Sequence, residues 1–245
     1  SFNLIVNLPI NVTGQNNELT LCDEATPNNQ STTFDLTVLN NQITLGTAGA
    51  TVTYYTTLAN AQAGTNAIVD ATNFVNTVNP QNVFAVVQTA QGCKSITIAK
   101  VRVAPLPEVN TTPLALIEKC DDDQSIIGTE EFDVTVNQSI VQGSFTGLMF
   151  EYYPTEADAH AGTNMIVDPM HYEGGNPNAT PPSNVVYIKV QNQHVDFFGN
   201  NCYVLVEQPI QVNPLPIIDN PVFVLCDDDA DGFATFTLSS YNEQL

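Results

Sequence analysis

Apolar residues alternate with polar ones in short stretches along most of the chain, and clusters rich in Asn, Thr, Gly and Pro separate these stretches. Alternation with a period of two is typical of β-strands that bury one face. The strands that this pattern predicts cover residues 33–38, 50–55, 83–88, 95–103, 185–190 and 203–212. We therefore expect a protein built from short strands joined by turns.

The strand pattern occurs twice because the chain contains an internal repeat. The segment that begins at Tyr54-Tyr55 returns 98 residues later at Tyr152-Tyr153, each time followed by an alanine-rich stretch and Gly-Thr-Asn. After Asp168 the offset grows to 103 and then to 109 residues, so the second copy carries two insertions. Units of about 100 residues with roughly seven short strands indicate an immunoglobulin-like β-sandwich.

Pro-Leu-Pro at residues 105–107 and again at 214–216 marks the end of a unit. Proline removes backbone donors and stiffens such a join without packing it. The fold class that we expect is all-β, with tandem immunoglobulin-like β-sandwich repeats that form an elongated rod. The predicted domains are residues 1–13, the end of a preceding repeat; 14–108, a complete repeat; 109–217, a complete repeat with two loop insertions; and 218–245, the start of a further, truncated repeat.

One helical turn interrupts the predicted strands. Thr155 and Asp158 have the spacing of a capping box, in which a side-chain oxygen accepts a hydrogen bond from an amide of the first turn. The alanines that follow favour a helix, and Gly162 can end it in the left-handed conformation.

The five cysteines follow the repeat, with one near the start of each complete unit and one before its last strand. These repeated positions predict disulfides within units, Cys22 with Cys93 and Cys120 with Cys202. We expect Cys226 to pair with a cysteine outside this sequence. Disulfides indicate an oxidising, extracellular compartment. Free buried thiols are the alternative, and zinc is disfavoured because the cysteines never come as close pairs.

The chain is strongly acidic, with 26 Asp and Glu residues against 5 Lys and Arg and a net charge of −21. Such a surface repels phosphate backbones and anionic headgroups, so we expect neither nucleic-acid binding nor peripheral membrane binding. No apolar run approaches the roughly 18–20 residues needed to span a bilayer, so we expect no direct membrane insertion. The charge is unevenly distributed: residues 14–108 carry −3, residues 109–217 carry −12 and residues 218–245 carry −6.

Much of the acidic excess follows the first cysteine of a unit. Asp227, Asp229 and Asp231 form Asp-x-Asp-x-Asp followed by glycine, a spacing at which alternate oxygens can surround a calcium ion. Asp121 and Asp123 form a shorter version in the second unit. The sequence therefore predicts calcium at these positions. The alternative is a solvated acidic turn, since the glutamate expected at position twelve of an EF-hand loop is missing.

The sequence contains no Gly-x-Ser-x-Gly elbow, no His-Glu-x-x-His motif and no glycine-rich phosphate-binding loop. A pair of carboxylates for glycoside hydrolysis stays open, but the acidic residues follow the starts of units, which does not favour a shared cleft. The histidines, His160, His171 and His194, all lie in the second unit, so chemistry shared by the repeats cannot depend on them. We expect them in exposed loops. The tyrosine pairs could form a sugar-stacking platform, but neighbours in a strand face opposite sides, which favours packing of one ring of each pair in the core. We therefore expect no enzymatic activity.

Taken in order, Cys-Asp-Asp-Asp, Phe-Asp-Leu-Thr, Tyr-Tyr with Ala-x-Ala-Gly-Thr-Asn-x-Ile, a second cysteine and Pro-Leu-Pro resemble the tandem repeats of giant cell-surface proteins of Bacteroidota. The chain is most similar to SprB-like gliding-motility adhesins exported by the type IX secretion system. The resemblance implies an extracellular filament at the cell surface, attached to the outer membrane through parts of the chain outside this sequence.

Three functions follow as expectations. In the first, the repeats are the stalk of an adhesin for gliding or surface attachment, and their partners are neighbouring repeats. In the second, they bind extracellular polysaccharide or another surface through their loops, for which exposed Phe197-Phe198-Gly199 is the candidate. In the third, they are a spacer in a secreted multidomain polysaccharide enzyme.

Overall fold

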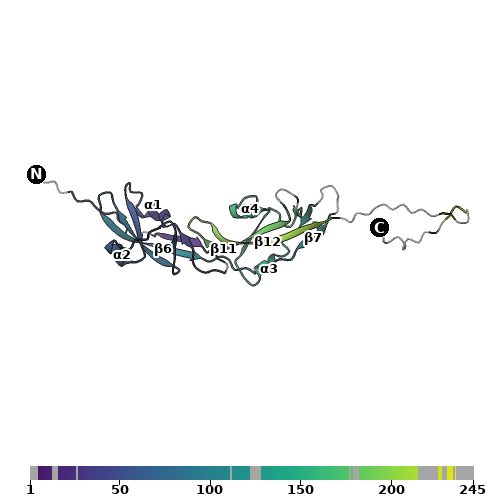
Figure 1. Ribbon diagram of the computed structural model, residues 1–245, viewed down its shortest axis with the longest axis horizontal. Helices are drawn as coiled ribbons and strands as arrows, with labels where there is room; N and C mark the ends of the chain where they lie inside the picture. Colours follow the sequence, from purple (N-terminus) through teal and green to yellow (C-terminus); the bar gives the residue numbers. More distant parts are fainter. Residues whose placement is uncertain are drawn as a thin grey trace.

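The computed structural model describes residues 5–12, 16–25, 27–110, 112–121, 128–176, 178, 182–214, 226–227, 231–233 and 235. Two β-rich domains lie end to end along the long axis of the molecule (Figure 1). The described residues form twelve strands and only short helices, which confirms the all-β fold class. None of these helices is long and apolar enough to cross a membrane.

The first domain is built on a four-stranded sheet with the strand order β1-β6-β5-β3. Its first strand runs parallel to its last, while the other neighbours are antiparallel. A two-stranded sheet of β2 and β4 and three short helices complete the domain. The elements are β1 (Glu18–Cys22), β2 (Thr33–Phe34), η1 (Leu36–Leu39), α1 (Asn40–Ile43), β3 (Thr51–Tyr55), α2 (Leu58–Ala63), β4 (Phe74–Val75), β5 (Gln81–Gln88) and β6 (Lys94–Ala104).

The second domain repeats this plan with the order β7-β12-β11-β9 and a two-stranded sheet of β8 and β10. Its first strand is again parallel to its last. The insertion before the second cysteine lengthens the hairpin of β11 and β12. The elements are β7 (Ile117–Cys120), β8 (Glu130–Phe132), α3 (Gln138–Gln142), β9 (Met149–Tyr153), α4 (Glu156–Ala161), β10 (Tyr172–Gly174), β11 (Val185–Val195) and β12 (Asn201–Asn213).

Each domain has its own hydrophobic core. Phe34 lies at the centre of the first and Phe132 at the centre of the second, and both are fully buried. Both rings of each tyrosine pair are buried, whereas the sequence predicted that only one ring of each pair would pack in the core. Tyr54 packs in the main core, as expected, whereas Tyr55 packs against Ala61 of α2 on the opposite face of the sheet.

The predicted helical turn is confirmed as α4. Thr155 accepts a hydrogen bond from the amide of Asp158 at 3.1 Å, and Gly162 ends the helix with a φ of 67°. The first domain has the same turn in α2, with Thr57 as the capping residue and Gly64 at the end. The repeat therefore preserves both ends of this helix.

The strand predicted at residues 33–38 is only partly correct. It ends at Phe34, and residues 36–39 form the helical turn η1. The cause is Asp35, whose carboxylate accepts a hydrogen bond from the amide of Thr37 at 2.9 Å and thereby favours a turn. Leu36 and Leu39 then lie on one side of the turn, and both are fully buried.

The pairing of β1 with β6 is reinforced by charge. Glu18 contacts Arg102 at 2.5 Å and Lys100 at 3.3 Å. The hydrogen bond from Arg102, together with the nearby Lys100, lowers the pKa of Glu18 below its ordinary value of 4.5. A carboxylate with a lowered pKa in the folded state stabilises the fold above its ordinary pKa, and this contribution is lost as the pH falls through the lowered value.

We therefore expect Glu18→Gln to remove a pH-dependent part of the stability. Between pH 7 and pH 3, the free energy of unfolding should fall less in this variant than in the original protein, because Glu18 no longer has to be protonated. Urea unfolding at both pH values measures the difference. Glu108→Gln, a change at an exposed glutamate, is the control. An equal fall in all three proteins would contradict a role of Glu18.

Candidate functional site

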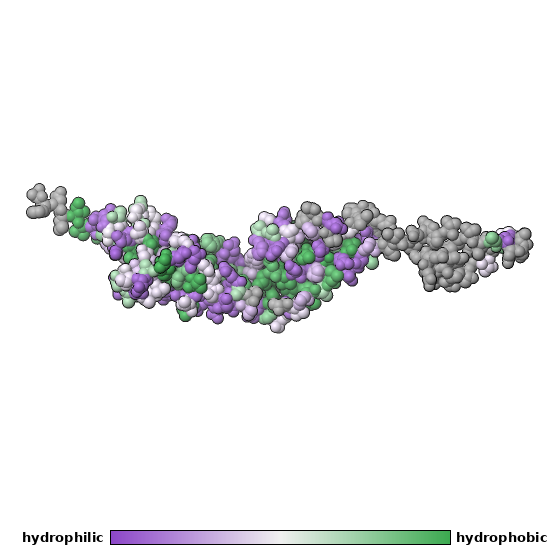
Figure 2. All heavy atoms as spheres, viewed as in Figure 1, coloured by the Kyte–Doolittle hydropathy of each residue, from purple (hydrophilic) through white to green (hydrophobic). Residues whose placement is uncertain are grey.

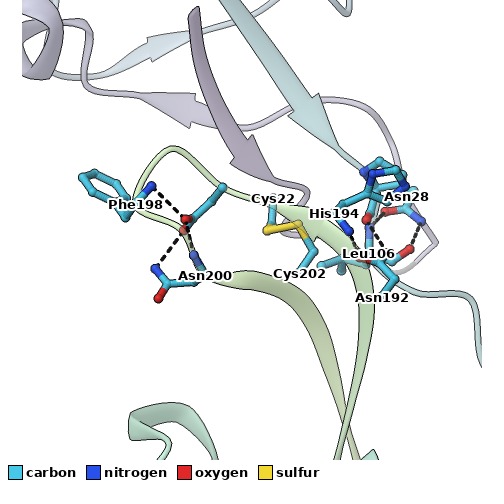
Figure 3. Close-up of a disulfide and its surroundings, with 10 residues drawn as sticks. Cys22, Asn28, Leu106, Asn192, His194, Phe198, Asn200 and Cys202 are labelled. Atoms are coloured by element: carbon cyan, nitrogen blue, oxygen red, sulfur yellow. Dashed lines mark hydrogen bonds between the residues drawn. A yellow bond between two sulfur atoms is a disulfide. The ribbon is translucent and has the colours of Figure 1, made fainter. Parts of the chain in front are cut away.

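The feature that joins the two domains is a disulfide between Cys22 and Cys202, whose Cα atoms are 5.4 Å apart (Figure 3). Both predicted pairs, Cys22 with Cys93 and Cys120 with Cys202, are therefore wrong. Cys93 and Cys120 are free thiols, and so is Cys226. The bond connects residues 180 positions apart in the sequence and links one domain to the next.

The strand register explains why a disulfide within one domain does not form. Cys22 lies opposite Ala104 at the end of β6, whereas Cys93 directly precedes the start of this 11-residue strand. At about 3.3 Å per residue the two cysteines of the first domain are roughly 35 Å apart, while a disulfide needs Cα atoms within about 7 Å. In the second domain, Cys120 lies opposite Asn213 at the far end of β12 from Cys202. Each domain thus carries its cysteines at opposite ends.

A loop of the second domain contacts the first domain beside the disulfide. We call residues 192–200, at the end of the β11–β12 hairpin, the hairpin tip. The amide of Phe197 donates a hydrogen bond of 2.7 Å to the carbonyl of Thr20 in β1. The rings of Phe197 and Phe198 are exposed, as predicted, and Figure 3 shows Phe198 pointing away from the disulfide. The backbone of the hairpin tip, and not its aromatic rings, makes this contact with β1.

Asp196 shapes the hairpin tip. Its carboxylate accepts hydrogen bonds of 2.8 Å from the amides of both Phe198 and Asn200. The side chain of Asn200 adds a third bond at 3.1 Å. Because these bonds fix the turn around residue 197, they orient the amide that reaches Thr20.

We expect Asp196→Ala to loosen the junction while the disulfide remains. The turn loses three hydrogen bonds, so the amide of Phe197 should exchange its hydrogen faster, by about fivefold to tenfold if about 1 kcal/mol of local stability is lost. Hydrogen–deuterium exchange with mass spectrometry measures this. Asp70→Ala is the matched control, because Asp70 shapes a similar turn with Thr72 and Asn73 in an exposed loop. Unchanged exchange at the hairpin tip would argue against this role.

The segment that leads from one domain to the next is hydrogen-bonded along its length. Asn28 holds Leu106 on both sides: its carbonyl oxygen accepts from the Leu106 amide at 2.7 Å, and its amide group donates to the Leu106 carbonyl at 3.2 Å. From the other domain, the side chain of Asn192 donates to the carbonyl of Pro105 at 2.9 Å. Pro107 is buried. The join is therefore packed, and the prediction that proline stiffens it without packing it is wrong in this second part.

Two grooves flank the junction. The first, of about 1080 Å³, is lined by apolar side chains of the connecting segment and of β12, among them Pro107, Val109, Leu114, Leu205 and Pro209. Figure 2 shows hydrophobic residues gathered on the second domain near its boundary with the first. The second groove, of about 870 Å³, is polar and lies between residues 21–24 and the second domain.

Aromatic and charged side chains of the second domain line the polar groove. The ammonium group of Lys189 lies 4.3 Å from the ring centroid of Tyr203, and the hydroxyl of Tyr203 lies 2.6 Å from Nδ1 of His160. Burial, together with a hydrogen bond to Glu151, raises the pKa of Tyr153 to about 12. The tyrosines therefore stay neutral at physiological pH. Such a surface can hydrogen-bond a polar ligand. Its histidine is exposed, as are His171 and His194, but the prediction of loop positions is wrong for two of them, since His160 lies in α4 and His194 in β11.

The residues predicted to bind calcium are described only in part. Asp123 and Asp229 lie outside the described residues. Asp121 is buried next to β7, while Asp227 and Asp231 each accept a hydrogen bond from a backbone amide a few residues further on, at 2.7 and 2.8 Å. In the described part of the chain, no three His, Cys, Asp or Glu side chains lie close enough together to hold a metal ion. Calcium binding stays a prediction.

Only some of the residues that hold the junction could be predicted from the sequence. Asp196 followed three residues later by Gly199 indicates a tight turn, and the insertion between Gln191 and Cys202 marks the hairpin as unusual. Asn28 and Asn192, in contrast, resemble the many other asparagines of the chain. Their partners come from distant segments, so no local pattern identifies them.

Two segments of the chain, residues 18–107 and 116–216, match the family described as the Flavobacterium inter-domain disulphide bond domain. Together they cover well over half of the sequence, and each contains one four-stranded sheet. The chain belongs to this family and contains two copies of its domain. The bond between Cys22 and Cys202 is an inter-domain disulfide of the kind that the family's description names. Since such bonds persist in oxidising compartments, these are extracellular repeat domains.

No curated protein sequence matches this chain. Among solved structures, human mucin-like protocadherin EC1-2 is similar at 11% identity over 69% of this chain and 86% of its own, with a TM-score of 0.25. SGBP-B of Bacteroides ovatus, in complex with a mixed-linkage heptasaccharide, shows 15% identity over 84% of this chain and 46% of its own, with a TM-score of 0.19. Zebrafish RET cadherin-like domains 1 to 4 show 14% identity over 84% and 49%, with a TM-score of 0.23. TM-scores this low assign neither a superfamily nor a function to the chain.

Proposed function

We propose that this chain is part of the stalk of a large cell-surface adhesin of the SprB-like kind, which serves gliding motility or surface attachment. The observation that carries the proposal is the disulfide between Cys22 and Cys202, which joins two copies of one domain end to end. A covalent bond at the junction limits rotation and bending between the domains. This property suits a spacer that holds an adhesive part away from the cell.

Other features of the junction support the same role. The hydrogen bonds from Phe197 to Thr20 and from Asn192 to Pro105 restrict the second domain beside the disulfide. The acidic surface favours solubility and discourages association with anionic membranes. Under this proposal the chain has no catalytic role, its partners are neighbouring repeats, and export follows the type IX route that the sequence resemblance implies.

Exchange of the domains in the bacterium tests the proposal. Residues 18–216 are replaced in the chromosomal gene by an unrelated pair of domains of similar length, and attachment and gliding are scored under flow. A stalk tolerates the exchange and fails only when the segment is deleted without replacement. If the exchanged strain is as defective as the deletion strain, these domains do more than separate other parts. Antibody labelling of intact cells checks surface exposure in each strain.

Binding of a surface glycan is the second candidate, and the polar groove at the junction favours it. Tyr203, His160 and Asn200 offer an aromatic ring and hydrogen-bonding groups in one concavity formed by both domains. A glycan array with the purified chain separates the candidates. Binding that is lost in Tyr203→Ala supports the glycan reading, while an array without signal supports the stalk.

A further inference from the structure

The apolar groove beside the junction has the size of a ligand site. Its volume is about 1080 Å³, at the upper end of the range typical of such sites. Half-buried side chains of the second domain line it, among them Val109, Phe145, Val204 and Val206. Figure 2 shows hydrophobic residues gathered on the second domain near its boundary with the first. Apolar surface gathered in one groove of an otherwise polar protein is typical of an interaction site.

The first domain shows that the fold does not require an apolar lining here. Residues before Asp168 follow the repeat offset of 98, and β12 follows β6 at 109, since Ala104 and Asn213 each pair with the cysteine that ends the first strand of their domain. Leu205 has an apolar counterpart at these offsets, Ile96. Five other apolar residues of the groove, Val109, Leu114, Phe145, Val204 and Val206, correspond to Asn11, Asn16, Thr47, Ser95 and Thr97. The apolar lining is therefore a feature of the surface of the second domain and not of the fold.

The acidic residues of the groove differ between the domains in the opposite sense. Glu108 and Glu207 line the groove and are exposed, at positions where the first domain has Ile10 and Ile98. Among the described residues that line the groove, none is Lys, Arg or His. An acidic groove attracts cationic groups and repels carboxylates and phosphates. A ligand must therefore combine apolar groups with positive charge, which excludes fatty acids and acidic polysaccharides.

The groove follows an edge of β12 along which an extended chain can lie. β7 pairs with β12 only at residues 210–213, while residues 204–207 and 209 line the groove. In the first domain, an N-terminal segment lies beside the equivalent part of β6, where the hydroxyl of Ser95 donates to the carbonyl of Ile10 at 2.6 Å. Val204 stands in place of Ser95 and has no hydroxyl to form this bond. An extended backbone beside this edge can instead come from another chain.

The walls beside this edge are fixed before any ligand binds. The amide of Asn110 donates to the carbonyl of Val141 in α3 at 2.9 Å. The side chain of Asn110 accepts a hydrogen bond from the amide of Thr112 at 3.1 Å. On the side of the first domain, Asn28 holds the backbone of Leu106. Because these segments are already ordered, binding costs less conformational entropy.

We propose that this groove binds an extended segment of another protein, in which two or three aliphatic side chains lie between Lys or Arg residues. The aliphatic side chains pack against Phe145, Val204 and Val206, and the cationic groups lie near Glu108 and Glu207. A second copy of this chain is a poor partner, since it has 26 acidic residues against 5 basic ones. The inference goes beyond the stalk and does not depend on it, because it gives these domains a partner other than neighbouring repeats.

Three libraries of short peptides test the site. In the first, alternating Leu, Ile or Val residues lie between terminal lysines. The second has glutamate in place of each lysine, and the third has serine or threonine in place of each aliphatic residue. Each library is incubated with the full chain, size exclusion recovers the bound peptides, and mass spectrometry identifies them. Fluorescence anisotropy then measures the dissociation constants of the recovered peptides.

Two pairs of substitutions alter the groove in different ways. Glu108→Gln with Glu207→Gln removes the charge of two exposed residues, and Val204→Ser with Val206→Thr gives the groove the residues of the first domain. We expect the first library to yield several-fold more bound peptide than either of the others. The dissociation constants should rise about threefold to tenfold in each pair. Circular dichroism checks the folding of each variant, and the glutamate pair decides if the valine pair does not fold.

Glu118→Gln with Glu173→Gln is the matched control, because it removes the same charge from exposed residues outside the groove and should leave the affinity unchanged. Equal recovery from the three libraries, or an affinity that neither groove pair lowers, would overturn the proposal. So would a concentration-dependent dimer, seen by light scattering, that the valine pair abolishes, because a second copy would then occupy the groove. None of these results bears on the domain exchange that tests the stalk.

Discussion

Replacing both Cys22 and Cys202 by alanine is expected to free the two domains from their fixed arrangement while each domain stays folded. The two cores share no residue, so neither depends on the bond for its packing. What is lost is the constraint between the domains. In the chain-entropy model, closure of a loop with a sequence separation of 180 is worth about 5 kcal/mol against the unfolded chain.

Small-angle X-ray scattering measures the result, as a broader distribution of interatomic distances in the double variant. Circular dichroism should show unchanged β-structure at 25 °C, and thermal unfolding should shift to lower temperature. Cys93→Ala with Cys120→Ala is the matched control, since it removes two thiols that form no disulfide in this structure. A double variant as rigid as the control would mean that the hydrogen bonds from Phe197 and Asn192 hold the junction without the disulfide.

Phe132→Ala is expected to destabilise the second domain by about 3–5 kcal/mol, the usual cost of removing a buried phenylalanine. The ring of Phe132 is fully buried in the second core. The backbone at Gly175 approaches this ring closely, since a Cβ atom added there would lie 3.0 Å from it. Hydrogen–deuterium exchange should show the loss of protection in β11 and β12.

The matched variant is Phe34→Ala, which removes the equivalent ring of the first core. Its effect should appear in β5 and β6 and leave the second domain protected. Exchange that rises equally in both domains for either variant would contradict the presence of two separate cores. The comparison is best made with the disulfide intact, so that the arrangement of the domains does not change between variants.

The sequence predicted the parts of the fold that depend on local chemistry. Thr155 and Gly162 define both ends of a helix by capping and by a left-handed turn, so the repeat was sufficient to place it. Alternation predicted the central strands for the same reason. The error at residues 36–38 arose where apolar spacing fits a strand or a turn equally well, and the carboxylate of Asp35 decided between them.

The disulfide could not be predicted in this way, because it depends on the pairing of strands far apart in the sequence. A parallel pairing of β1 with β6 puts Cys22 at the opposite end of the domain from Cys93, whereas an antiparallel pairing would have brought them together. No local pattern distinguishes these arrangements. The residues that complete the junction, such as Asn28, owe their role to the same long-range geometry.

The bond between Cys22 and Cys202 also decides how the molecule responds to pulling. Tension applied across the two domains follows the shortest covalent path, which reaches Cys22 through β1, crosses the sulfur–sulfur bond and continues from Cys202 through β12. Everything between positions 23 and 201 lies outside this path. Unfolding either domain therefore adds little length while the bond is oxidised. Once the bond is reduced, unfolding of both domains can add up to roughly 600 Å of extended chain. A tether built in this way transmits a pull without stretching.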